Sequence, residues 1–222
     1  MTTHYQHLFL DGSSVNLPVG KVVCIGRNYA EHAKELNNPI PSKPLLFIKP
    51  NTALADLRNP LEIPSYSKIC HHELEFALLI GKPLKKANVS DVAAAIIGYA
   101  LALDLTLRDL QDELKVKGHP WEMAKAFDNA CPISPFIPVE QIQDPQNVDI
   151  RLTVNGQLRQ EGNTRQMITK INELLAYIST YFTLLPGDVV LTGTPAGVGE
   201  LKSGDQLLLE LENDYSFVTT VA

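Results

Sequence analysis

Three carboxylate side chains stand at positions from which they could hold a divalent cation. Glu73 and Glu75 are two residues apart in a segment, residues 73–80, with apolar side chains on every second position. Side chains on a strand alternate between its faces, so the two glutamates project from one face, about 7 Å apart at the backbone. Like charges that close repel each other, and a cation between them would remove the repulsion.

Asp104 is a third candidate ligand, near the end of an almost uncharged run, residues 96–105. A carboxylate buried there without a partner would be costly. Contributed from a neighbouring strand, it would complete three oxygen ligands with no thiolate, which suits Mg²⁺ or Mn²⁺ with waters in the remaining positions. The alternative is that Glu73 and Glu75 face water and that Asp104 caps the helix after it.

A zinc site is not indicated. His71 and His72 lack the His-Glu-x-x-His spacing of helical zinc sites, so both are expected to be structural or surface histidines. Cys24, Cys70 and Cys131 lie far apart, without a Cys-x-x-Cys motif, so we expect neither a disulfide framework nor a zinc cluster. Their apolar neighbours predict buried, unreactive thiols.

His32 and Glu35 form a candidate general base. They lie three residues apart on a short predicted helix and therefore share a face. A carboxylate beside an imidazole raises its basicity and fixes its orientation, as a base near neutral pH requires. The alternative is a solvated pair on an exposed helix. Three prolines follow this helix, so it could form a mobile lid.

Further polar residues could contact an anionic substrate. Arg108 and Gln111 share a helical face, which could equally be a solvated one. Lys125 lies among mostly apolar neighbours and could stabilise a carboxylate or oxyanion, unless its ammonium group reaches solvent. The glycine-rich stretch 193–199, which contains Thr194, could bind an anion through backbone N–H groups.

Short strands outnumber helices in the elements that should position these residues. The patterns predict helices at residues 28–36, 91–95, 106–117 and 167–182. They predict strands at residues 5–10, 21–25, 45–48, 73–80, 96–105, 149–154, 157–160, 188–191 and 206–212. Asn155-Gly156 joins two of these strands as a hairpin. This balance favours a β-rich α+β fold with a few covering helices.

Bulk properties narrow the class of protein. With 222 residues, 45% of them hydrophobic, the chain suits one domain of good size or two small ones. A net charge of −6 without a basic cluster makes nucleic acid an unlikely partner. The first ten residues do not resemble a signal peptide, and no apolar run has the roughly 20 residues of a membrane span. The expected location is the cytoplasm.

Taken together, the motifs resemble the fumarylacetoacetate hydrolase family, in particular its short acylpyruvase and oxaloacetate decarboxylase members. The resemblance covers roughly residues 20–215, and the motifs occur in family order. They are Gly26-Arg27-Asn28-Tyr29-Ala30-Glu31-His32, His72-Glu73-Leu74-Glu75, Ala102-Leu103-Asp104-Leu105-Thr106, Arg108-Asp109-Leu110-Gln111, Lys125-Ala126-Phe127-Asp128 and Thr192-Gly193-Thr194-Pro195-Ala196-Gly197-Val198-Gly199.

The resemblance implies a single catalytic domain over residues 1–222, with residues 1–20 as an N-terminal extension. It implies a mixed β-sandwich or β-roll fold and a homodimer. It also implies a role for each residue: Mg²⁺ or Mn²⁺ ligands (Glu73, Glu75, Asp104), catalytic residues (His32, Glu35, Lys125) and substrate-contacting residues (Arg27, Arg108, Gln111, Thr194).

The activity implied is metal-dependent cleavage of acylpyruvates to pyruvate and a carboxylic acid, or decarboxylation of oxaloacetate. The substrate would be a small 2-keto acid or 1,3-dicarbonyl compound. A second hypothesis is an isomerase or tautomerase of hydroxy-diene-dioates or oxaloacetate at the same site. A third is a ligand-binding module with a structural metal.

Overall fold

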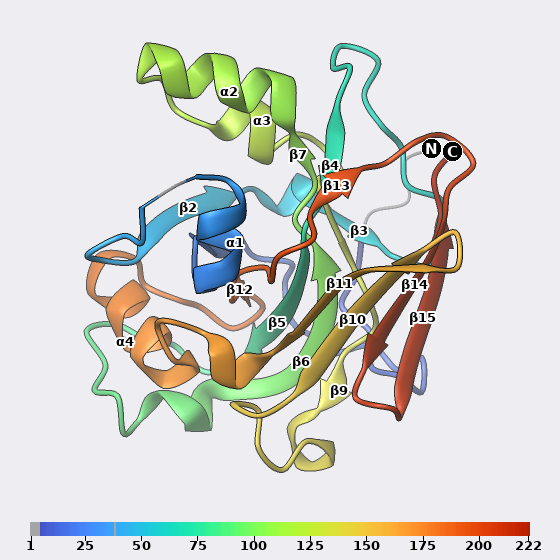
Figure 1. The fold of residues 1–222 in the computed structure, drawn as a ribbon. Coiled ribbons are helices and arrows are strands. Elements are labelled where there is room, and N and C mark those ends of the chain that lie inside the picture. The colour runs from blue at the N-terminus through green and yellow to red at the C-terminus, as the bar shows by residue number, and fades with distance from the viewer. Residues whose placement is uncertain (1–4, 38) are drawn as a thin grey trace.

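Strands dominate the computed structural model, which describes residues 5–37 and 39–222 (Figure 1). The first four residues of the predicted N-terminal extension lie outside the described residues. The strands are β1 (Val22–Gly26), β2 (Leu45–Lys49), β3 (Leu54–Asp56), β4 (Cys70–His72), β5 (Leu74–Ile80), β6 (Ile96–Leu103), β7 (Thr106–Leu107), β8 (Cys131–Ile133), β9 (Ile137–Pro138), β10 (Asp149–Val154), β11 (Gln157–Asn163), β12 (Val189–Leu191), β13 (Gly199–Glu200), β14 (Gln206–Leu211) and β15 (Tyr215–Thr220). The α-helices are α1 (Ala30–Glu35), α2 (Arg108–Lys117), α3 (Glu122–Lys125) and α4 (Ile171–Tyr181). Short 3₁₀ turns are η1 (Asn51–Ala53), η2 (Val92–Ala95), η3 (Val139–Gln141) and η4 (Thr164–Gln166).

The largest sheet is mixed and has the strand order β2-β1-β12-β5-β6-β8-β3, with β9 beside β6. β1 pairs with β12 in parallel and β3 pairs with β8 in parallel, whereas the other pairs of this sheet are antiparallel. The parallel pair matters for the site, because parallel strands end at the same edge of a sheet. The segments that follow β1 and β12 therefore emerge side by side.

Two smaller sheets complete the fold. One is an antiparallel sheet of order β11-β10-β14-β15, and the other joins β13, β4 and β7. The predicted hairpin at Asn155-Gly156 is confirmed, and both turn residues have positive φ, 52° and 76°. This double left-handed turn matches the twist of the strands that it connects. The predicted β-rich α+β class is confirmed as well.

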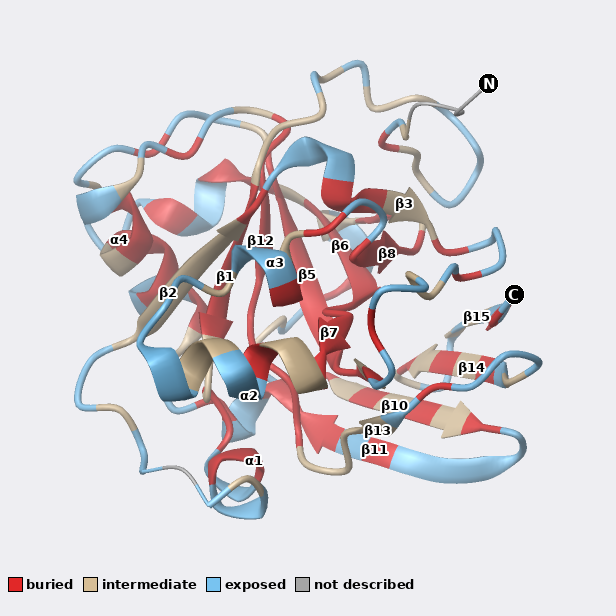
Figure 2. Cartoon of the chain, turned by 90° about the horizontal axis from the view of Figure 1, so that it is seen from above, coloured by how far each residue is buried: buried red, intermediate tan, exposed pale blue. Residues whose placement is uncertain are grey.

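Burial explains why the β5–β6 pair can carry a buried site. All seven residues of β5 are buried, and Figure 2 shows β5 and β12 within the core. β5 lies between β12 and β6, and β10 packs against it. Both faces of β5 are therefore covered, and the alternative in which Glu73 and Glu75 face water is wrong, since they are 5% and 2% exposed.

Three predicted helices begin later in the structure than in the pattern, the first of them at Ala30 instead of residue 28. The helix predicted over 106–117 begins at Arg108, because Thr106 and Leu107 pair with His71 and Cys70 as strand β7. The helix predicted over 167–182 begins at Ile171 and ends at Tyr181. The apolar residues at helical spacing begin before the helix does, because a capped 3₁₀ turn and the extended Lys170 occupy the positions before Ile171.

Other expected elements were wrong in type or extent. Residues 5–10 do not form a strand, because Leu8 and Phe9 make only single bridges and the chain turns back at Gly12. The predicted helix at 91–95 is the 3₁₀ turn η2. The second hairpin strand, predicted to end at 160, extends to Asn163, and strand β15 was not predicted.

Among the described residues, no helix combines the length and apolar character needed to cross a membrane.

Candidate active site

Strand register brings the three carboxylates together. Glu73 directly precedes β5 and Asp104 directly follows β6. These two strands are antiparallel neighbours, with Leu74 opposite Leu103, and the Asp104 N–H donates to the Glu73 carbonyl at 2.8 Å. Glu75 projects from the same face as Glu73, two residues further along. Oxygens from all three carboxylates lie within 4.8 Å of one another. All three side chains are buried.

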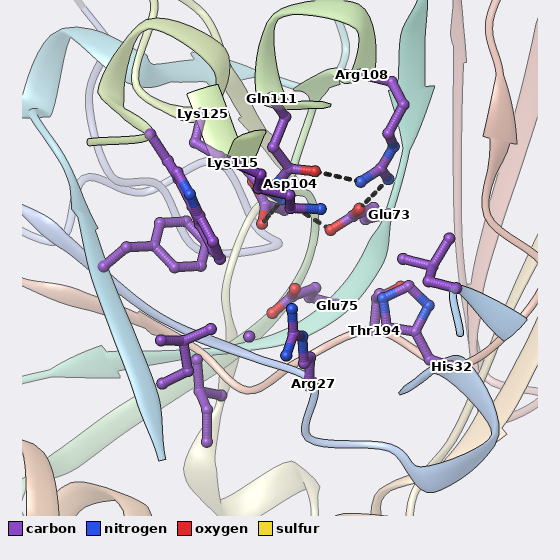
Figure 3. A pocket seen from close by; sticks show the side chains of 16 residues that line it. Arg27, His32, Glu73, Glu75, Asp104, Arg108, Gln111, Lys115, Lys125 and Thr194 are labelled. Carbon is purple, nitrogen blue, oxygen red and sulfur yellow. Dashed lines mark hydrogen bonds and ion pairs between the residues drawn. The ribbon is translucent and has the colours of Figure 1, made fainter. Parts of the chain in front are cut away.

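Buried cations surround this acidic cluster (Figure 3). Lys125 Nζ donates to Glu73 Oε2 at 2.8 Å and to Asp104 Oδ2 at 2.7 Å. Arg108 Nη2 donates to Glu73 Oε1 at 2.5 Å, and its Nη1 donates to Gln111 Oε1 at 2.6 Å. Lys125, Arg108 and Gln111 are 4%, 9% and 3% exposed, so the alternatives in which they are solvated are wrong.

The cations pair unequally with the three carboxylates, so the pKa values of Glu73 and Glu75 shift in opposite directions. Burial would raise the pKa of Glu73, but the Lys125 and Arg108 cations hold that pKa well below its usual range. Burial raises the pKa of Glu75 well above its usual range, and the Asp104 and Glu73 carboxylates add to the increase. Burial lowers the pKa of Lys125, yet Asp104 and Glu73 more than reverse this and raise it. Among the described residues, the buried cations form their ion pairs with Glu73 and Asp104 and not with Glu75.

The donor set fits a hard divalent cation. No described group donates a hydrogen bond to the buried Asp104 Oδ1, and the Gly193 N–H donates a 2.6 Å hydrogen bond to Glu75 Oε2. Lys49 Nζ lies 2.7 Å from Asp104 Oδ1, but it directs its hydrogen bonds to the carbonyls of Lys125 and Ala130. Three carboxylates around such oxygens suit Mg²⁺ or Mn²⁺.

The helix α1 places the candidate base at this cluster. His32 is 5% exposed, and its Nδ1 lies 3.4 Å from Glu35 Oε2. The Glu35 carboxylate also accepts hydrogen bonds from the Gly197 N–H at 3.0 and 3.2 Å. The predicted pair is therefore not a solvated neighbour pair, because one member is buried and the other binds a second loop. With Nδ1 directed at Glu35, the other ring nitrogen is free to face the pocket.

The loop after β12 lies against the segment after β1. The Asn28 side chain donates to the carbonyls of Thr169 and Thr192 and accepts from the Thr169 N–H. Gly193 has a φ of 97°, and a Cβ there would lie 2.6 Å from the Asn28 Cβ, so only glycine fits this approach. The close contact brings Thr194 into the pocket wall.

Two buried residues that support the site were missed at the sequence level. Lys49 is 0% exposed at the end of β2, and a lysine ending an apolar strand was the available signal. Gln160 is also 0% exposed. Its Oε1 accepts from the Leu74 N–H and from His72 Nδ1, both at 2.9 Å, and its Nε2 donates to Thr194 Oγ1 at 2.8 Å. No sequence pattern points to Gln160.

The acidic cluster, the cations around it and His32 line one pocket that is partly open to solvent. Nine of the ten predicted site residues line it, and Glu35 stands behind His32. Lys115 and Trp121, which were not predicted, line it too. The lining residues predicted from the sequence are Arg27, His32, Glu73, Glu75, Asp104, Arg108, Gln111, Lys125 and Thr194.

The remaining titratable candidates are structural. Cys24, Cys70 and Cys131 are free and buried, as predicted, and burial raises the pKa of Cys70 and of Cys131 to about 12. His72 is buried and bound to Gln160, and burial lowers its pKa, which keeps it neutral. Neither His71 nor His72 belongs to the group of possible metal ligands among the described residues, which consists of Glu73, Glu75 and Asp104.

Comparisons with known proteins agree in family and differ in reaction. A family model for the fumarylacetoacetate (FAA) hydrolase C-terminal domain matches residues 21–222. The oxaloacetate tautomerase YcgM of Escherichia coli K12 is 55% identical over 218 residues, which are 98% of this chain and 99% of that protein. A mitochondrial oxaloacetate decarboxylase of Dictyostelium discoideum is 45% identical over 201 residues, covering 89% of this chain and 92% of that one.

A solved structure adds a ligand. The crystal structure of fumarylpyruvate hydrolase from Pseudomonas aeruginosa, in complex with Mn²⁺ and pyruvate, superposes with a TM-score of 0.92 at 36% identity. The match covers 100% of this chain and 97% of that one. The fold described above is thus shared with a protein that binds a divalent metal and a 2-keto acid.

Proposed function

Because this chain belongs to the fumarylacetoacetate hydrolase family, as its motifs predicted, we propose that it is a metal-dependent enzyme that interconverts the keto and enol forms of oxaloacetate. One observation carries the proposal: a buried cluster of three carboxylates, two of which are bridged by Lys125, shares one pocket with His32. The related enzymes named for oxaloacetate chemistry favour this substrate over other 2-keto acids.

Glu73, Glu75 and Asp104 would hold Mg²⁺ or Mn²⁺. When bound, such a cation supplies positive charge that stabilises an enolate and binds keto acids. Arg108 and Gln111, fixed to each other at 2.6 Å, would orient the substrate carboxylate. Arg27 and Thr194 line the same pocket and would complete the substrate contacts. The Lys125 ammonium would donate to the oxygen on which negative charge develops.

His32 would move the proton. In the keto form of oxaloacetate, the C3 hydrogens are acidic because the resulting carbanion is conjugated with the C2 carbonyl. The His32 ring would take one C3 proton, and transfer of that proton to the C2 oxygen would yield the enol and restore the ring. Glu35, 3.4 Å from Nδ1, would stabilise the imidazolium formed on the way.

Hydrolysis of acylpyruvates is the second candidate. The similarity to a fumarylpyruvate hydrolase that binds Mn²⁺ and pyruvate favours it. In this reaction His32 would take a proton from water, which attacks the distal carbonyl, and the carbon–carbon bond would break to release pyruvate as its enolate. Oxaloacetate decarboxylation forms the same enolate by losing CO₂ and needs no placed water. A ligand-binding module with a structural metal is disfavoured by the family's enzymes.

A substrate panel tests the proposal. We expect the purified protein with Mg²⁺ or Mn²⁺ to accelerate the decay of the oxaloacetate enol absorbance, and chelation of the metal to abolish that acceleration. Pyruvate release from oxaloacetate, acetylpyruvate and fumarylpyruvate, measured with a coupled dehydrogenase, ranks the alternatives. A Lys125→Met variant should be inactive in every assay. Turnover of acylpyruvates without any effect on the oxaloacetate enol would reject the tautomerase in favour of the hydrolase.

The assembly and the location remain predictions. We expect a homodimer, which light scattering on the purified protein checks. A single catalytic domain and a cytoplasmic location are likewise expected, and a single cooperative unfolding transition would support the former.

A further inference from the structure

The cations of the pocket fall into two groups. Arg108 and Lys125 are bound to buried carboxylates at 2.5 to 2.8 Å. Arg27 and Lys115 line the same pocket, and neither makes a close ion pair with another described residue. The nearest carboxylate oxygen to Lys115 Nζ belongs to Asp112, at 3.9 Å, on a side chain that is 65% exposed. An ion pair that loose and exposed contributes little.

The helix α2 aims Lys115 into the pocket. Arg108, Gln111 and Lys115 follow one another at spacings of three and four residues, so they form one stripe along the helix. Their shared stripe lines the pocket, whereas Val116 and Lys117 point outward. Lys115 Nζ lies 5.7 Å from the centroid of the Trp121 ring, which is also part of the pocket wall. This cation–π contact holds the ammonium group at the wall.

Arg27 approaches the same space from the other side. It directly follows β1 and has a φ of 59°, in the left-handed region that a long side chain seldom adopts. Such backbone strain persists where the surrounding structure fixes it, often at a functional site. Figure 3 shows the guanidinium group of Arg27 directed into the pocket, near Glu75 and Thr194.

Two positive groups therefore line the pocket without a close ion-pair partner among the described residues. Burial lowers the pKa of Lys115, and the Arg108 and Arg27 charges lower it further, against the opposing effect of the Asp112 and Glu73 carboxylates. Positive groups that face one another in a cleft attract and concentrate an anion. Since Arg108 and Lys125 already stand beside the proposed metal ligands, the unpaired charges are left for a second negative group of the same substrate.

Resting on the function proposed above, we propose that Lys115, with Arg27, forms a second anion subsite that binds the distal carboxylate of a short 2-keto dicarboxylate. The inner carboxylate and keto oxygen of such a substrate belong at the acidic cluster with Lys125, Arg108 and Gln111. The subsite therefore makes Lys115 a specificity-determining residue. It ranks oxaloacetate, which ends in a carboxylate, above acetylpyruvate, which ends in a neutral ketone.

A Lys115→Met variant tests the subsite by a ratio of substrates. We expect kcat/KM for oxaloacetate to fall about tenfold, as for loss of one charge-assisted hydrogen bond, mainly through KM. For acetylpyruvate we expect a change of less than about twofold, because no charge at that end is lost. Lys115→Arg should restore most of the ratio. The matched control is Lys117→Met, which removes an exposed charge from the same helix and should leave the ratio unchanged.

Binding of unreactive ligands separates this inference from the proposed function. Malate and 2-hydroxybutyrate have equal chain lengths, but only malate carries the distal carboxylate. Calorimetry with Mg²⁺ present should show that the wild type prefers malate and that Lys115→Met loses this preference. Equal loss of both substrates or an unchanged malate preference would overturn the subsite. A wild type that prefers malate without turning over any keto acid would overturn the function and keep the subsite.

Discussion

The acidic cluster and the helix α1 meet in one pocket, but the chain builds them by opposite means. Glu73, Glu75 and Asp104 stand on or beside central strands, and each is at most 5% exposed. The helix α1 has six residues and no side-chain N-cap, and Glu35 on it is 33% exposed at the side chain. Strand register fixes the cluster, whereas a few hydrogen bonds to a neighbouring loop hold the helix.

This difference separates two kinds of catalytic work. Charges that stabilise an enolate act best when they are rigid and dry before the substrate arrives. A proton-transferring group on a short, partly exposed element can move aside to admit a substrate and then return. Such a movement would have to break the hydrogen bonds between Glu35 and Gly197 and between Asn28 and Thr192.

The largest expected effect comes from the cluster itself. Glu75→Gln removes one of three charged ligands, so we expect Mn²⁺ affinity to fall by more than about 100-fold and activity to vanish at ordinary metal concentrations. Calorimetric titration with Mn²⁺ measures the affinity. Glu161→Gln, on an exposed side chain paired with Arg151, is the matched control and should bind as the wild type does. Full affinity in Glu75→Gln would place the metal elsewhere.

The next largest effect is expected from a substitution on the helix α1. His32→Ala removes the proposed base, so we expect oxaloacetate tautomerisation and acylpyruvate hydrolysis to slow by at least about 100-fold. Decarboxylation needs no base to generate the enolate and should suffer far less. Parallel assays of enol decay and pyruvate release measure the two. Equal losses would contradict the division of labour between His32 and the cluster.

A smaller effect is expected from the residue that joins the two regions. Gln160 binds the Leu74 N–H beside the cluster and Thr194 in the loop near α1. Gln160→Leu leaves these groups unpaired, at about 1–3 kcal/mol each for buried polar groups, so we expect a lower Tm together with a higher KM. Gln157→Leu, at an exposed position of the same strand, is the control. A lower Tm with unchanged KM would reduce Gln160 to a purely structural residue.

The smallest expected effect is a gain in thermal stability from Glu75→Gln, the substitution that should weaken metal binding most. In the metal-free protein, Glu75 lies buried beside two other carboxylates, so its charge destabilises the fold. Glu75→Gln should therefore raise the Tm of the chelated protein at pH 8, by about 2–4 °C if the relief is near 1 kcal/mol. Adding Mg²⁺ should stabilise the wild type and not the variant. Lower stability of the chelated variant would mean that the glutamate is held by more than its one hydrogen bond.

Much of the cluster could be predicted from the sequence, because strand periodicity is local. Two glutamates at spacing two must share a face wherever a strand forms, and Asp104 at the end of an apolar run needed a partner. The assignment of His32 and Glu35 depended on the family resemblance, since a helical pair of this kind is common on surfaces. The structure brings the cluster and His32 to one pocket, with Glu35 behind His32.

The residues that were missed depend on contacts distant in sequence. Gln160 acquires its partners only when the hairpin β10–β11 packs against the strands beside the cluster, and no spacing rule encodes that packing. Lys49 looked like the polar end of a strand, although its ammonium group is buried against Asp104. Strand β15 alternates weakly in sequence, because the apolar Val218 faces solvent and the polar Thr219 is buried.

The parallel pairing of β1 with β12 has a kinetic consequence. Val22 aligns with Val189, so strands near opposite ends of the chain must meet before the loops after them can close the pocket. Contacts between such distant segments slow folding, because the loop between them must be closed first. A nascent chain that still lacks its last strands can form the β5–β6 hairpin but cannot complete the pocket. Recovery of activity should therefore lag behind recovery of secondary structure when the denatured protein is refolded.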